Sequence, residues 1–165
     1  MRRRHLALAV AAVLLAGLGA WFTAAANSLR SGEAASNIAV VDAEATAEVT
    51  AAVTNAVNRI FTYTHENTAA TEQAASEVLR GNARGSYDAL FAQVRREAPG
   101  QRLSVTTRVV DSAVRSLTGD SAEVLVFLDQ SATREGASPG AAAAQLLVSV
   151  RREGERWVVI ELEPR

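Results

Sequence analysis

The sequence predicts an α+β fold in which helices come first along the chain and an antiparallel sheet follows. Three observations support this prediction. Apolar residues recur about every four positions between residues 38 and 98, which is the spacing of amphipathic helices. After Pro99-Gly100 the spacing changes to about two and β-branched residues become frequent, as in strands. The chain has 165 residues, and the part that follows an apolar N-terminal segment is long enough for about one domain.

The longest predicted helix covers residues 38–64. One apolar stripe at four-residue intervals defines it: Val41, Ala45, Val49, Val53, Val57 and Phe61. Asp42 and Glu44 lie in its first turns and Arg59 in a late turn, where each charge interacts favourably with the helix dipole. These patterns predict a stable helix with one buried face.

Two shorter helices are expected over residues 71–80 and 86–98. Thr71 is the expected N-cap of the first, and Gly81 is its expected left-handed terminator. The second has one apolar face with i, i+3, i+4, i+7 spacing, formed by Tyr87, Leu90, Phe91 and Val94.

Four strands are then expected, over residues 102–117, 121–130, 143–152 and 156–162. The alternation breaks near Asp111, which predicts a bulge. The nearly continuous apolar run of the second strand predicts a central position, covered on both faces. Ser131 to Gly140 is expected to be a polar loop. Helices followed by a strand meander predict a sheet that curls around the helices.

The N-terminal segment 6–29 has no charged residue and would be about 36 Å long as a helix, against about 30 Å for a bilayer core. Arginines precede it, so we expect a cytoplasmic stub at 1–5, a transmembrane anchor at 6–29, a connector at 30–37 and an extracytoplasmic domain at 38–165. The alternative is a signal peptide cleaved after Ala26. Both interpretations export the remainder of the chain.

Composition excludes several classes of function. Four of the 17 basic residues, Arg2, Arg3, Arg4 and Arg30, precede the first of the 18 acidic residues, so the rest of the chain has a net charge of -5. An acidic exported part argues against nucleic acid as a partner. The chain has no cysteine, hence no disulfide, thiolate nucleophile or cysteine-based metal site.

No catalytic, cofactor-binding or metal-binding residues are predicted. His5 and His65 are the only histidines, and no G-x-S-x-G motif accompanies them. His65 is expected to be a solvated loop residue. Asp129 ends an apolar strand, where it is either a base with a raised pKa or, more simply, a turn residue or the partner of a nearby arginine. The candidate partner or pocket contacts are Tyr63, Tyr87, Asp129, Gln130, Thr133 and Arg134.

Several short segments occur in an order that resembles a known family. They are Asp42-Ala43-Glu44-Ala45-Thr46, Arg59-Ile60-Phe61-Thr62-Tyr63, Tyr87-Asp88-Ala89-Leu90-Phe91, Ala98-Pro99-Gly100-Gln101, Gly119-Asp120, Val126-Phe127-Leu128-Asp129-Gln130, Thr133-Arg134 and Trp157. Together, behind an N-terminal apolar segment, they resemble the Mce-associated membrane proteins, the Mam-type accessory subunits of actinobacterial Mce lipid transporters. One departure is Thr64, where the family usually carries an acid.

The resemblance implies a cone-like domain of the nuclear-transport-factor-2-like or cystatin-like kind, with helices packed on a curved antiparallel sheet. It also implies a non-enzymatic, single-pass membrane protein that stabilises or assembles an Mce-type lipid import complex in the cell envelope. Its partners would be Mce transporter subunits, other Mce-associated proteins and, through residues 6–29, the lipid bilayer. No cofactor is implied.

Two alternatives stay open on the same fold. One is a small-ligand-binding or isomerase-like pocket, with Asp129 or Asp111 as base and Tyr63 or Tyr87 as acid. The other is an interaction module of a secretion-type envelope machine. For an accessory subunit, the candidate contact surfaces are the exposed face of the long helix and the segment from Ser131 to Gly140.

Overall fold

Three helices precede four strands in the part of the chain that the computed structural model describes, residues 42–135 and 138–165. The expected cytoplasmic stub, membrane anchor, connector and cleavage site all lie outside these residues. Within them, no helix combines the length and the apolar character needed to cross a bilayer.

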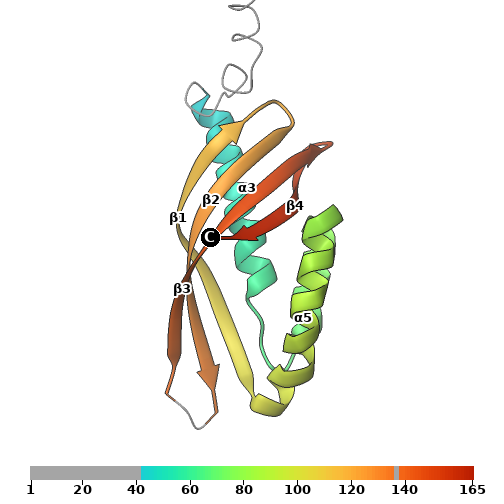
Figure 1. Ribbon diagram of the computed structural model, residues 1–165, viewed down its shortest axis with the longest axis vertical. Helices are drawn as coiled ribbons and strands as arrows, with labels where there is room; N and C mark the ends of the chain where they lie inside the picture. Colours follow the sequence, from blue (N-terminus) through green and yellow to red (C-terminus); the bar gives the residue numbers. More distant parts are fainter. Residues whose placement is uncertain (1–41, 136–137) are drawn as a thin grey trace, which may run out of the picture. The chain divides into compact units, whose positions relative to one another are not determined.

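The elements in chain order are α3 (Ala43–Phe61), α4 (Thr68–Val78), α5 (Gly81–Gln101), β1 (Leu103–Leu117), β2 (Ser121–Arg134), β3 (Gly140–Glu153) and β4 (Arg156–Pro164). The strands form one antiparallel sheet in the order β1-β2-β3-β4 (Figure 1). The predicted α+β class, with helices first and a strand meander after them, is confirmed.

The sequence of α3 explains both its start and its buried face. Asp42 is the N-cap, and its Oδ1 accepts a hydrogen bond from the Ala45 amide at 2.8 Å. Glu44 lies in the first turn and Arg59 in the last, as predicted. The predicted stripe packs against the sheet, and Val49, Val53, Val57 and Ile60 are at most 1% exposed.

The start of α4 differs from the prediction. Asn67 is the N-cap, and its Oδ1 accepts from the Ala70 amide at 3.2 Å, so Thr71 lies within the helix. Thr71 is buried and its hydroxyl donates to the Thr62 carbonyl at 2.8 Å. The prediction of Thr71 as the N-cap was wrong, because its hydroxyl instead completes the segment that follows α3.

The bounds of α5 also differ, since the helix covers Gly81–Gln101 where 86–98 was expected. The Arg80 amide donates to the Val159 carbonyl at 2.8 Å, and Gly81 then turns the chain with a φ of +53°. Gly81 therefore starts α5 and does not simply terminate α4. Pro99 lies in the last turn, where it removes one i→i−4 hydrogen bond, and the helix ends two residues later.

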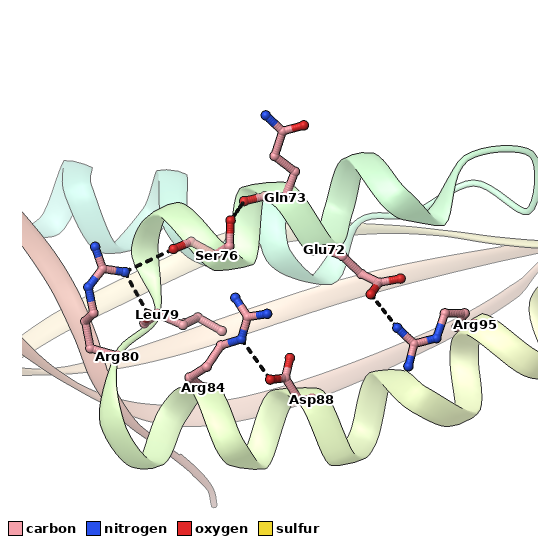
Figure 2. Close-up of polar contacts among 8 residues, drawn as sticks. All are labelled: Glu72, Gln73, Ser76, Leu79, Arg80, Arg84, Asp88 and Arg95. Atoms are coloured by element: carbon pink, nitrogen blue, oxygen red, sulfur yellow. Dashed lines mark hydrogen bonds and ion pairs between the residues drawn. The ribbon is translucent and has the colours of Figure 1, made fainter.

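Charged side chains link α4 to α5 on their outer surface (Figure 2). Arg95 donates to Glu72 across the two helices at 2.6 Å. Arg80 donates to the carbonyls of Ser76 and Leu79 at the end of α4, at 3.0 and 2.8 Å. These contacts hold the two shorter helices side by side.

The core lies between the helices and one face of the sheet. Its members include Val53, Val57, Ile60, Leu79, Tyr87, Phe91, Val124, Val126, Val148, Val150 and Val159. The central position predicted for β2 is confirmed, because β1 and β3 flank it. Cover on both faces is not found: Leu125 and Phe127 on the opposite face are half-buried, since the helices pack against the other face.

The sheet is longer than predicted at the end that holds the β2–β3 turn. The register shift between Val109 and Asp111 confirms the predicted bulge. The first four residues of the expected loop, Ser131 to Arg134, are strand, because β2 continues to Arg134. The first residues of β1 pair with Ser131 to Arg134 and supply the hydrogen-bond partners that this extension needs.

Candidate functional site

Side-chain hydroxyls from three elements surround the C-terminal end of α3. Tyr87 Oη, from α5, donates to the Ile60 carbonyl at 3.0 Å. Thr107 Oγ1, from β1, donates to the Phe61 carbonyl at 2.9 Å, and Thr71 from α4 binds the next carbonyl, that of Thr62. The last carbonyls of a helix have no partner within it, so these hydroxyls satisfy groups that would otherwise be buried unpaired.

The two tyrosines remain protonated at neutral pH. Burial, and next the carboxylate of Glu72, raises the pKa of Tyr87 above its ordinary value of 10. Burial likewise raises the pKa of Tyr63. Tyr63 packs edge-on against Phe91 with ring centroids 5.9 Å apart, and Phe91 stacks on Tyr87 at 5.1 Å. Both phenols act as hydrophobic packing groups, and that of Tyr87 also acts as a hydrogen-bond donor.

An apolar groove of about 650 Å³ opens between α5 and the sheet. Its apolar lining includes Phe61, Tyr87, Leu90, Leu128, Leu146 and Leu162. Leu90 on α5 is 61% exposed and contributes to the apolar lining. This groove combines an apolar lining with a few polar groups, and it is the candidate functional site.

Two of the six predicted contact residues, Tyr87 and Gln130, line this groove. Gln130 Nε2 donates to Thr107 Oγ1 at 2.9 Å, so it belongs to the same network that completes α3. Tyr63 lies behind the groove in the aromatic cluster and pairs through its backbone with Val105. The Tyr87 hydroxyl and the Gln130 amide are therefore already engaged in structural hydrogen bonds.

Asp129 does not reach the groove. It is exposed on the opposite face of β2 and lies directly across from Arg108 on β1. Asp111, the other candidate base, is also exposed, and its Oδ1 accepts from the Ser112 amide at 2.8 Å. Neither carboxylate converges with the Tyr87 hydroxyl, as acid and base must in a shared catalytic pocket.

Thr133 and Arg134 line a second, polar hollow at the beginning of β1. His65 lies there as well, half-buried, with its amide 3.1 Å and its Nδ1 3.0 Å from Ser104 Oγ. His65 lies in a turn, as predicted for a loop residue, but it is only partly solvated because the segment after α3 pairs with β1. Sequence analysis missed Ser104 entirely, since 39 residues separate it from His65.

Neither hollow resembles a metal centre. No group of three or more histidine, aspartate or glutamate side chains suited to a metal ion occurs in residues 42–135 and 138–165. The apolar groove offers mainly shape and apolar contact, and the Tyr87 hydroxyl and Gln130 amide in its lining are already paired.

Comparison with known sequences finds relatives but no named family, since no family model matches the chain. Two proteins of Mycobacterium tuberculosis, the uncharacterized proteins Rv1362c (strain H37Rv) and MT1407 (strain CDC 1551), are each 31% identical over 107 residues. The match covers 64% of this chain and 49% of each relative, so the chain spans about half the length of the curated relatives it matches. Similarity to an actinobacterial sequence agrees with the coarser part of the predicted resemblance.

Solved structures with the same fold have very different sequences. An IcmL-like type IV secretion system protein from Legionella pneumophila has a TM-score of 0.63 at 8% identity, covering 72% of this chain and 91% of its own. A periplasmic fragment of TraM has a TM-score of 0.62 at 11% identity, and the match covers 74% of this chain and 98% of the fragment. Agrobacterium tumefaciens VirB8 has a TM-score of 0.54 at 16% identity, and the match covers 75% of this chain and 94% of the VirB8 chain. At these identities the likeness shows the fold alone, a nuclear-transport-factor-2-like arrangement.

Proposed function

We propose that this chain is a non-enzymatic, membrane-anchored accessory subunit that stabilises or assembles an Mce-type lipid import complex in the cell envelope. The observation that carries the proposal is the apolar groove beside the exposed Leu90, in which the Tyr87 hydroxyl and the Gln130 amide are bonded within the fold. A large apolar side chain exposed at the edge of an apolar concavity is typical of a protein-binding surface.

The comparisons support the proposal in two ways. The relatives belong to Mycobacterium tuberculosis, in keeping with an actinobacterial subunit. Among the structures with the same fold, one is a type IV secretion system protein and another is a periplasmic fragment. A domain of this fold that works within an envelope assembly, on the outer side of the membrane, is consistent with both.

In the proposed mechanism, the domain stabilises the complex by binding other subunits at the membrane surface. The predicted anchor at 6–29 and the short connector at 30–37 would hold the domain at the outer surface of the membrane. Confinement raises its effective concentration towards other membrane-held subunits, so a modest interface is enough for association. In this proposal a side chain of a transporter subunit occupies the groove and Leu90 packs against it.

Affinity purification of the tagged full chain from detergent-solubilised actinobacterial membranes tests the proposal. Mass spectrometry should detect Mce transporter subunits enriched with the wild-type chain. Leu90→Arg should reduce that enrichment about tenfold, since it places a charge against an apolar partner. Val110→Arg is the matched control, because Val110 is also a large exposed hydrophobic residue, at 53%, and lies on β1.

Recovery of the wild-type chain without any transporter subunit would contradict the proposed assembly role. Equal loss of the transporter in both variants would show that Leu90 contributes no more to transporter binding than Val110 does. In that case the exposed face of α3 becomes the next surface to test.

A second candidate function is a small apolar ligand held in the same groove, whose volume and lining fit that use. Native mass spectrometry of the full chain released from detergent distinguishes the two. A defined adduct that disappears in Leu128→Trp, which fills the groove, supports the ligand. Loss of transporter binding in Leu90→Arg without any adduct in the wild type supports docking.

A further inference from the structure

The polar hollow is a second site, separate from the apolar groove. Three segments form it: the connection between α3 and α4, the junction of α5 with β1, and the end of β2. Its volume is about 650 Å³, and its lining is polar throughout: His65, Glu66, Arg102, Ser104, Thr133, Arg134 and Glu135.

Arg102 stands at a position that favours glycine. Its φ of 47° and ψ of 42° are left-handed, and it is the only non-glycine residue with positive φ in the described parts of the chain. Glycine is the usual residue after a helix C-terminus because it has no Cβ to crowd the backbone. Residues held in such unfavourable conformations gather at functional sites.

The hollow that contains Arg102 also contains the imidazole of His65 and the hydroxyls of Ser104 and Thr133. His65 contacts Ser104 Oγ through both its amide and its ring, so the ring is held in one orientation. Ser104 and Thr133 are directly opposite each other on β1 and β2, and so their side chains share one face of the sheet. The hollow thus holds an imidazole and two hydroxyls near its arginines.

The charges of the hollow are not fully paired. Arg102 forms an ion pair with Glu135, and Glu66, 83% exposed, lies 4.0 Å from His65 Nε2. Arg134 donates to the neutral Gln101 Oε1 at 2.7 Å and has no carboxylate partner among the residues that the structure describes. The Arg134 guanidinium therefore has donor groups that no carboxylate occupies, in a lining that holds two arginines and two glutamates.

We propose that this hollow binds a phosphate group. A guanidinium donates two parallel hydrogen bonds to phosphate oxygens, and hydroxyl and imidazole donors can satisfy the remaining ones. The group could belong to free phosphate or to a lipid headgroup, which share this chemistry. The proposal is independent of the assembly role of the apolar groove.

A titration of the full chain in detergent micelles with inorganic phosphate, at constant ionic strength, tests the site. The NMR signal of the His65 ring should shift in a saturable way. Arg134→Gln should weaken binding about tenfold, because a charge-assisted pair is lost. Arg156→Gln is the matched control: it removes the charge of an exposed arginine on β4 and should leave binding unchanged.

Arg102→Gly separates binding from folding. Glycine relieves the left-handed backbone, and the lost ion pair is exposed on both sides, at 61% and 63%, so the melting temperature should rise. Phosphate affinity should fall in the same variant. Wild-type phosphate affinity in Arg102→Gly would overturn the proposal, whatever happens to stability.

A second titration identifies the source of the phosphate. Soluble dihexanoyl phosphatidic acid is compared with dihexanoyl phosphatidylcholine and with inorganic phosphate. Tighter binding of phosphatidic acid supports the site and assigns a lipid headgroup, whereas equal binding of phosphatidic acid and inorganic phosphate supports a site for the phosphate group alone. No saturable shift of His65 with either overturns the proposal.

Discussion

At the scale of single residues, the end of α3 depends on hydroxyl groups that other elements supply. Tyr87 Oη is buried and donates to the Ile60 carbonyl. Tyr87→Phe should lower the free energy of unfolding by about 1 to 2 kcal/mol, because the carbonyl is left buried without a partner. Urea unfolding measures the change.

The matched control for this prediction is Tyr63→Phe. The Tyr63 hydroxyl has no hydrogen-bond partner among the described residues, so the same chemical change should cost less than about 0.5 kcal/mol. Equal losses in the two variants would show that the bond to Ile60 contributes nothing particular.

Tyr87 also predicts how stability depends on pH. Its pKa is raised in the folded chain, so the folded state holds the phenolic proton more tightly than the unfolded chain. The resulting stabilisation is complete below about pH 10 and is lost as the pH rises above it towards the folded pKa. Urea unfolding from about pH 8 to 11.5 should show the free energy of unfolding falling only above pH 10.

The chain has two tyrosines, which makes the control simple. Burial raises the pKa of Tyr63 as well, so the double variant Tyr63→Phe/Tyr87→Phe should lose the decline above pH 10. A decline of unchanged steepness in the double variant would assign it to other groups.

At the scale of the elements, Glu48 joins α3 to the β3–β4 hairpin. Its carboxylate accepts two hydrogen bonds from Arg152, at 2.7 and 2.6 Å, and one from Trp157 Nε1 at 3.2 Å. The Arg152 guanidinium also lies over the Trp157 ring at 4.8 Å. Glu48→Ala should therefore lower the free energy of unfolding by about 1 kcal/mol or more.

Glu77→Ala is the control for Glu48→Ala. It removes the ion pair with Arg59, a single contact of 2.9 Å with both side chains nearly half exposed. Such surface pairs contribute about 0.5 kcal/mol or less. A loss from Glu48→Ala no greater than that from Glu77→Ala would contradict the stabilising contact of Glu48 with the β3–β4 hairpin.

Elements whose signals are local could be predicted from the sequence, and those that depend on distant partners could not. The apolar stripe and charge pattern of α3 and the bulge of β1 depend on neighbouring residues, and they occur as expected. The start of α5 depends on Arg80 pairing with β4, and the extension of β2 depends on β1. Neither pairing can be deduced from the local spacing of apolar residues.

In the candidate site, too, residues with local signals could be predicted and contacts between distant residues could not. Tyr87 belongs to the predicted apolar face of a helix and Gln130 ends the predicted apolar strand, and both line the groove. The contact of His65 with Ser104 was missed because it joins the end of α3 to the start of β1. Only the folded arrangement brings such residues together.

At the scale of the whole molecule, the described domain presents two different concave surfaces. One is apolar and lies beside the exposed Leu90, and the other is polar and contains Arg102 and Arg134. The hydroxyl network beneath the first is occupied in completing α3, which fits a binding surface better than a catalytic one. The proposed accessory role rests on the first surface.

Photo-crosslinking in living cells tests that role most directly. A benzoylphenylalanine placed at position 90 of the full chain should form an adduct with an Mce transporter subunit, and one placed at position 110 should not. Absence of any such adduct from position 90, or equal adducts from both positions, would contradict the proposal that the groove docks this chain onto the transporter.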